Sequence, residues 1–73
     1  MARPKILEEL YGARYDWLMA PFEEKAKMKA RFDKLKTQAA QQFGCSEMAL
    51  WLAVRNDYHL WRRQNRLPKP PEQ

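Results

Sequence analysis

Apolar side chains recur every three or four positions along most of the chain, a spacing that predicts amphipathic α-helices. Three such segments are expected, over residues 4–19, 21–43 and about 46–66. The first begins at Pro4, a residue favoured in the opening turn of a helix. Pro21 ends the first segment, because the residue before a proline avoids the helical region. The pattern therefore predicts three consecutive helices with short connections.

Each expected helix carries one apolar stripe, and the three stripes are expected to share a single core. The stripes consist of Leu7, Leu10, Tyr11, Trp17 and Leu18 in the first helix, Met28, Phe32, Leu35, Ala39 and Phe43 in the second, and Leu50, Val54, Tyr58 and Trp61 in the third. Gly12 interrupts the first stripe and is expected to admit a close neighbour.

The fold class expected from these patterns is all-α. Only three β-branched residues occur in the whole chain, which argues against a sheet. We expect a single domain, a three-helix bundle over residues 1–67, in which the second and third helices form a helix-turn-helix. The proline-rich tail, residues 68–73, is expected to be extended and disordered.

Length and cysteine content narrow the class of protein. A chain of 73 residues has room for one domain. It holds no apolar run of the roughly 20 residues that span a bilayer, and no signal peptide precedes the first helix. The single cysteine, Cys45, excludes an internal disulfide. We therefore expect a cytoplasmic protein that does not act at a membrane.

Side chains that could carry catalysis or bind a metal do not cluster in the sequence. His59 is the only histidine and Cys45 the only cysteine, so neither a His-rich nor a multi-cysteine metal site is expected. The spacing of Asp16, Asp33 and Asp57 pairs no carboxylates, and no nucleophile stands with a base. The chain is expected not to be an enzyme, and to bind no cofactor, metal ion or small-molecule substrate.

The net charge of +5 is unevenly distributed along the chain. Residues 21–43 carry six basic and three acidic side chains, and residues 44–67 carry four basic and two acidic ones. Clustered positive charge attracts polyanions such as nucleic acid or an anionic protein surface. A charge that only keeps small helices in solution would look the same, so charge alone leaves both interpretations open.

One segment carries a recognisable pattern of residue types. Residues 37–54 read Thr-Gln-Ala-Ala-Gln-Gln-Phe-Gly-Cys-Ser-Glu-Met-Ala-Leu-Trp-Leu-Ala-Val and resemble the helix-turn-helix motif of DNA-binding regulators. Ala40 supplies the small side chain where two helices cross, and Gly44 adopts the positive φ angle of the turn without strain. Ser46 caps the following helix. Phe43 before the glycine and Leu50 six residues after it match the large apolar positions of the motif.

The remaining positions of the segment show where the resemblance holds and where it departs. Cys45 stands at the small apolar position and is expected to seal the inside of the turn. Ala39 and Ala53 stand where the family usually carries larger apolar residues. An alanine-rich helical hairpin with a Gly-Cys-Ser turn would share this pattern, and it remains an alternative.

The resemblance implies that the third helix is a recognition helix that lies in the major groove of double-stranded DNA. The residues that would face the bases are Met48, Trp51, Leu52 and Arg55. Those that would meet backbone phosphates are Arg62, Arg63, Arg66 and Lys34 or Lys36, with His59 on the same face. The protein would then be a small basic DNA-binding protein, such as a transcriptional regulator or a phage or plasmid accessory factor.

The apolar part of that outward face supports a second hypothesis. Met48, Trp51 and Leu52, if exposed together, would form an interaction surface for a protein partner or for a second copy of the chain. The protein would then act as a helical adaptor or inhibitor. Because helix-turn-helix regulators are often dimers, the two hypotheses can hold together.

Overall fold

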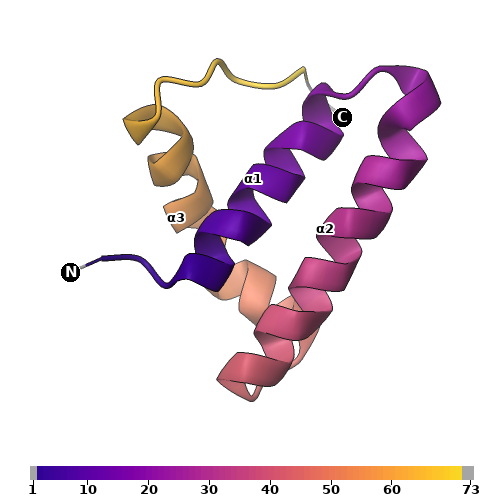
Figure 1. The fold of residues 1–73 in the computed structure, drawn as a ribbon. Coiled ribbons are helices and arrows are strands. Elements are labelled where there is room, and N and C mark those ends of the chain that lie inside the picture. The colour runs from indigo at the N-terminus through magenta and orange to yellow at the C-terminus, as the bar shows by residue number, and fades with distance from the viewer. Residues whose placement is uncertain (1, 72–73) are drawn as a thin grey trace.

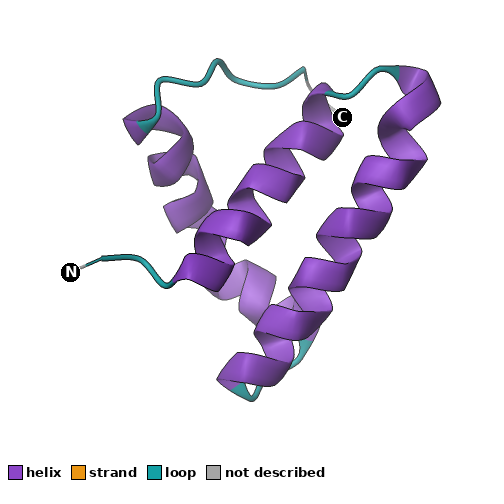
Figure 2. Cartoon of the chain, viewed as in Figure 1, coloured by secondary structure: helices purple, strands orange, loops and turns teal. Residues whose placement is uncertain are grey.

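The computed structural model describes residues 2–71, which form three helices and, within that range, no strand (Figures 1 and 2). Helix α1 spans Lys5–Met19, α2 spans Phe22–Phe43 and α3 spans Glu47–Gln64. The prediction of an all-α three-helix bundle is confirmed, with each boundary within about two residues of the expected one.

The two prolines that precede α1 and α2 stand at the N-cap positions. Pro4 and Pro21 have ψ angles of 141° and 159°, outside the helical region. Their carbonyl groups nevertheless accept the first hydrogen bonds of the helices, from the backbone N–H of Leu7 and of Glu24 at 3.0 and 2.9 Å. Proline fits this position because it has no N–H to leave unpaired.

Helices α1 and α2 lie side by side and run in opposite directions, whereas α3 diverges from the end of α2 (Figure 1). From that end, α3 passes behind α1 in this view instead of folding back along α2. Long side chains make the contact between α1 and α3: the Tyr11 ring meets the rings of Tyr58 and Trp61 at centroid distances of 5.8 and 5.9 Å. The bundle is therefore closed by aromatic rings and not by close backbone approach.

The core forms where these three helices meet. Its fully buried members include Tyr11 and Leu10 of α1, with Tyr58 of α3 only 2% exposed. The whole buried cluster consists of Leu7, Leu10, Tyr11, Ala13, Phe32, Ala39, Ala40, Leu50 and Tyr58. Most positions of the predicted stripes are confirmed as buried or half-buried, but Phe43 at the end of α2 is 45% exposed.

A left-handed glycine ends α2. Gly44 has a φ angle of +70°, and its N–H donates to the carbonyl of Gln41 at 3.3 Å. The N–H of Cys45 donates to the carbonyl of Ala40 at 3.0 Å. These two bonds form a Schellman motif, which satisfies carbonyl groups that the helix end would leave free. The predicted positive φ at Gly44 is confirmed.

The start of α3 is capped from two sides. The Ser46 hydroxyl accepts a hydrogen bond from the N–H of Ala49 at 3.1 Å, as predicted for an N-cap. The Thr37 hydroxyl of α2 donates to the Glu47 carboxylate at 2.7 Å. The turn is therefore held to α2 by a side-chain contact as well as by its own backbone bonds.

Two predictions about small residues were wrong. Cys45 is exposed and does not seal the inside of the turn, although its backbone N–H donates to the carbonyl of Ala40 in α2. A side chain added at Gly12 would meet nothing within 4 Å, so this glycine admits no close neighbour.

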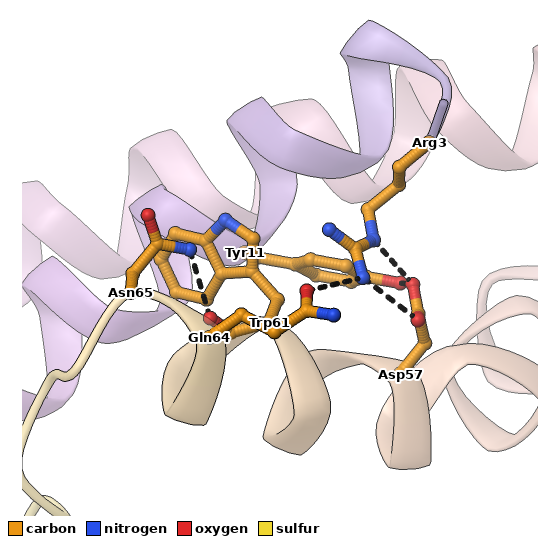
Figure 3. Close-up of polar contacts among 6 residues, drawn as sticks. All are labelled: Arg3, Tyr11, Asp57, Trp61, Gln64 and Asn65. Carbon is orange, nitrogen blue, oxygen red and sulfur yellow. Dashed lines mark hydrogen bonds and ion pairs between the residues drawn. The ribbon is translucent and has the colours of Figure 1, made fainter. Parts of the chain in front are cut away.

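An ion pair joins the N-terminal residues to α3 (Figure 3). Arg3 donates from Nε and Nη2 to the two carboxylate oxygens of Asp57, at 2.7 and 3.0 Å. The buried Tyr11 hydroxyl donates to the same carboxylate at 2.8 Å, and Arg3 also reaches Gln64 at 3.3 Å. Charged hydrogen bonds of this forked kind fix orientation as well as adding energy. This three-residue contact holds α3 against α1.

The chain leaves α3 through Arg66, whose φ angle of 56° is left-handed, and then runs back toward α1 (Figure 1). The Tyr15 hydroxyl of α1 donates to the carbonyl of Pro68 at 2.8 Å. Residues 68–71 carry no helix or turn, in keeping with the expected extended tail. The disorder expected for the tail stays a prediction, and residues 72 and 73 lie outside the described part.

Candidate nucleic-acid interface

The outer face of α3 changes from apolar to basic along its length. Near its N-terminus, Met48 is 75% exposed and Leu52 is 56% exposed. Arg55, His59 and Arg63 follow on the exposed part of the helix, with further positive charge beyond its end. A stripe of two apolar side chains continued by basic ones therefore faces solvent, as the sequence predicts.

Three arginines of this face are free to meet an anion. Arg55, Arg63 and Arg66 are exposed, and within residues 2–71 none of them forms an ion pair. The only other acidic side chain of α3 besides Glu47 is Asp57, which is occupied by Arg3. Positive charge on this side of the helix is thus not neutralised by acidic neighbours.

Arg62 does not join this exposed set, contrary to the expectation of a phosphate contact. The side chain is half-buried, and its Nη1 donates to the carbonyl of Leu67 at 3.1 Å. Its Nε is buried. The physical reason is the left-handed turn at Arg66, which brings the chain back over Arg62 and lets that guanidinium hold the end of α3.

Trp51 also differs from its predicted position in the groove. Its ring is half-buried and packs edge-on against Phe32 of α2, at a centroid distance of 5.6 Å, and against Tyr58 at 5.7 Å. The arrangement follows from the helical period: position 51 lies next to the buried position 50 and seven before 58, on the border of the apolar stripe. Trp51 therefore belongs mainly to the core and not to an outward recognition surface.

The two lysines of α2 that were expected to meet phosphates divide in the same way. Lys34 is exposed, with no ion pair to any residue in the described range. Lys36 is half-buried: its Nζ lies 3.6 Å from the Asp33 carboxylate and 5.1 Å from the centre of the Phe32 ring. Lys36 nevertheless lines a groove with Met48 and the apolar residues around it, so it borders the apolar end of the α3 face.

Arg14 was not predicted from the sequence, yet its guanidinium occupies the centre of the aromatic cluster. Its Cζ lies 4.5 Å from the centre of the Trp51 ring and 5.6 Å from each of three further rings, those of Trp17, Phe32 and Tyr58. A cation over aromatic faces is stabilised by the ring quadrupoles. Burial lowers the pKa of Arg14 from its usual value. No motif points to this residue, because its neighbours come from all three helices.

His59 stands in positive surroundings. Partial burial lowers its pKa below the usual 6.5, and the nearby charges of Arg62 and Arg63 lower it further, with smaller contributions from Arg14 and Lys69. The imidazole is therefore neutral at pH 7 and adds no charge to the face at that pH. It remains able to donate one hydrogen bond and to accept another.

The described residues hold neither a membrane span nor a metal cluster. No helix within residues 2–71 is both long enough and apolar enough to cross a bilayer. In the same range, no three side chains of histidine, cysteine, aspartate or glutamate gather as metal ligands would.

Comparison with protein-family models, with curated proteins and with solved structures finds no significant match to this chain. Function is therefore inferred from the geometry of its own residues.

Proposed function

We propose that this protein binds double-stranded DNA, with α3 lying in the major groove. The observation that carries the proposal is the exposed set Arg55 and Arg63 on α3 and Arg66 just beyond its end, none of which forms an ion pair within residues 2–71. In this arrangement Arg55 reads a guanine edge, since arginine makes a bidentate contact to that base. Arg63, Arg66 and Lys34 contact phosphates on either side of the groove.

The turn before α3 supports this proposal. Gly44 ends α2 in a left-handed conformation and Ser46 caps α3 three residues after α2 ends, which makes α3 diverge from α2 (Figure 1). The small Ala40 is buried near the turn, 4% exposed, and Leu50 on the inner side of α3 is equally buried. A divergent helix with its inner side anchored leaves its outer side free to enter a groove.

The proposal is tested by fluorescence anisotropy with a labelled duplex of random sequence at several salt concentrations. We expect binding that weakens as salt rises, with a log–log slope near −0.9 for each phosphate contacted. Changing Arg63→Glu and Arg66→Glu together should abolish binding at moderate salt and flatten the slope by about two contacts.

The control variant is Lys5→Glu, which reverses an exposed charge on α1 with no ion pair in the described part of the chain. It should bind almost as well as the unchanged protein. If Lys5→Glu weakened DNA binding as much as Arg63→Glu alone, the loss of net positive charge would explain both results. In that case α3 would not be the binding helix.

A second candidate function rests on the apolar end of the same helix. Met48 and Leu52 are exposed and, together with Trp51 and Phe32, line a groove of about 300 Å³ between α2 and α3. Exposed apolar side chains beside a groove are typical of protein interaction surfaces. The partner in this proposal is a protein that places an apolar side chain in the groove, either another protein or a second copy of this chain.

The second candidate is tested by sedimentation equilibrium and by affinity capture with Met48→Ala/Leu52→Ala as the matched variant. We expect the unchanged protein either to self-associate or to capture a partner protein, and we expect the double variant to lose this interaction. If the unchanged protein stayed monomeric at all concentrations and captured the same proteins as the double variant, this surface would not be a protein-binding site.

A further inference from the structure

A cleft of about 370 Å³ lies between α1, α3 and the C-terminal segment, on a part of the surface that the DNA proposal does not use. Its lining consists of Arg14, Leu18, Tyr58, His59, Arg62, Lys69, Pro70 and Pro71. None of these eight residues is acidic, and three of them are arginine or lysine. The cleft therefore gathers hydrogen-bond donors and positive charge, and no carboxylate is among the described side chains that line it.

Three residues that line this cleft carry buried polar atoms without a hydrogen-bond partner in the described chain. Within residues 2–71, the buried side-chain nitrogen and oxygen atoms that lack a hydrogen-bond partner are Nε of Arg14, the hydroxyl of Tyr58 and Nε of Arg62. All three belong to residues that line the cleft. Leaving a buried donor unpaired costs about 1–3 kcal/mol each, so unpaired groups gathered in one place call for an explanation.

The surrounding charges favour an anion. After the larger effect of burial, the nearby charges of Arg62, Arg63, Arg14 and Lys69 lower the pKa of His59 further, so the charged groups around its ring are positive. The aromatic rings around Arg14 provide π faces, and Arg14 forms no ion pair with a carboxylate of residues 2–71. A bound anion would give Arg14, Tyr58 and Arg62 the hydrogen bonds that their buried atoms lack within residues 2–71, and it would offset the charge of the two arginines.

Among anions, the number and kind of donors fit a phosphate group best. Two guanidinium groups, a phenol hydroxyl and an imidazole N–H supply more donors than the two oxygens of one carboxylate usually take. A phosphate offers three or four oxygen acceptors to arginine forks. The volume also leaves room for a substituent on the phosphorus.

We propose that this cleft, formed by Arg14, Tyr58, His59 and Arg62 beside the C-terminal segment, binds one phosphate group. The group comes either from a free phosphate or phosphate monoester, or from a backbone diester of nucleic acid. The proposal does not depend on α3 entering a DNA groove.

The probe is inorganic phosphate, followed by NMR of the His59 imidazole and of the Arg14 Nε–H. We expect saturable shifts of both signals, and a rise in the pKa of His59, that equal ionic strength of sodium chloride does not produce. The variant Tyr58→Phe removes a hydroxyl that has no partner in the described chain, so it should fold normally and bind phosphate roughly tenfold more weakly.

Two further variants distinguish phosphate binding at this cleft from a general effect of positive charge. Arg14→Gln should weaken phosphate binding at least as much as Tyr58→Phe, whereas Lys34→Gln, which removes an exposed charge from α2, should leave it unchanged. Because Arg14→Gln can also disturb the core, Tyr58→Phe decides the test if that variant does not fold. Absence of saturable shifts, or an unchanged affinity in folded Tyr58→Phe, would overturn the proposal.

A competition arm distinguishes the sources of the phosphate. Displacement of inorganic phosphate by a DNA duplex identifies the diester, and its retention in the presence of DNA identifies a free phosphate or monoester. Either result supports the site. DNA binding that persists while inorganic phosphate fails to bind would reject this inference alone and leave the function proposed for α3 standing.

Discussion

Asp57 of α3 is a single carboxylate that accepts hydrogen bonds from the N-terminal segment and from α1. Arg3 and Tyr11 donate three bonds to its two oxygens, and the Tyr11 hydroxyl has no other partner among the described residues (Figure 3). Because Tyr11 is fully buried, the loss of its charged acceptor cannot be made good by water.

We expect Asp57→Asn to lower the free energy of unfolding by about 2 kcal/mol, since hydrogen bonds to charged groups contribute roughly 1.5–3 kcal/mol. Urea denaturation followed by tryptophan fluorescence measures the change. The matched control is Asp16→Asn, which removes an exposed pair with Arg31 at 3.5 Å and should cost less than about 1 kcal/mol. If Asp57→Asn and Asp16→Asn lowered the free energy of unfolding equally, the Asp57 contact would contribute no more to stability than an exposed ion pair.

The same carboxylate gives the protein a part of its acid sensitivity. Its hydrogen bond from Arg3 holds the pKa of Asp57 below the usual 3.8 in the folded state. A group whose folded pKa is depressed stabilises the fold above its unfolded pKa, and this stabilisation is lost as pH falls through the folded value. Unfolding free energy should therefore decline below about pH 4, through protonation of Asp57 among other groups.

Asp33 provides the comparison, because the Lys29 ammonium likewise lowers its pKa but does so on an exposed helix surface. Thermal unfolding between acid and neutral pH should show a shallower pH dependence in Asp57→Asn than in Asp33→Asn. The reverse order would show that the exposed pair carries more of the acid sensitivity.

At the scale of single elements, the two glycines of the chain have opposite roles. Gly44 ends α2 at a φ angle of +70°, where a side chain is strained, whereas Gly12 lies inside α1 with open space around it. A glycine inside a helix has only a conformational cost, while a left-handed glycine at a helix end is required by the turn.

We therefore predict opposite signs for two chemically identical changes. Gly12→Ala should raise the free energy of unfolding by about 0.5–1 kcal/mol, and Gly44→Ala should lower it by about 1–2 kcal/mol. In a domain of this size, 1 kcal/mol shifts the melting temperature by roughly 4–8 °C, so differential scanning calorimetry resolves both. A stabilising Gly44→Ala would contradict the left-handed turn itself.

At the scale of the whole molecule, the three helices meet around Arg14 and Trp51. Trp51 contacts Arg14 of α1, Phe32 of α2 and Tyr58 of its own helix. This meeting point holds α3 in its divergent position, together with the contacts that α3 makes with Tyr11 of α1 and with Arg3 of the N-terminal segment.

Trp51→Ala should consequently lower the free energy of unfolding by about 3 kcal/mol, at the low end of the range for tryptophan truncation because the ring is only half-buried. Met48→Ala and Leu52→Ala, at exposed positions on the same helix, should each change it by less than about 0.5 kcal/mol. Chemical denaturation of the three variants measures this difference. If Trp51→Ala lowered the free energy of unfolding by much less than this, Trp51 would belong to the outward surface that the sequence first indicated.

The elements themselves could be predicted from local features of the chain. The prolines at positions 4 and 21, the glycine at 44 and the serine at 46 each act on their own backbone, so their effects do not depend on distant residues. The apolar period likewise locates the inner face of each helix, and most of the expected core is buried. Helix bounds, fold class and the capped turn are the confirmed predictions of this kind.

Contacts between helices could not be predicted in the same way. A side chain on the border of an apolar stripe turns inward or outward according to what the neighbouring helix presents, and this decided Trp51, which packs on Phe32 of α2. Arg62 was decided by the chain beyond α3, which turns back and places the carbonyl of Leu67 within reach of its guanidinium. The Arg3–Asp57 pair joins residues that are far apart in the chain, so no local spacing of residues predicts it.

The amino-acid sequence by itself determined where this chain is helical, where it turns, which face of each helix is apolar and that its charge is positive, because these properties arise within a few residues. Only the tertiary structure decided which cations are free and which are enclosed. That outcome depends on how the helices cross and on how the chain turns after α3. The crossing surrounds Arg14 with four rings, the turn at Arg66 brings the carbonyl of Leu67 to Arg62, and Arg55, Arg63 and Arg66 are left in solvent.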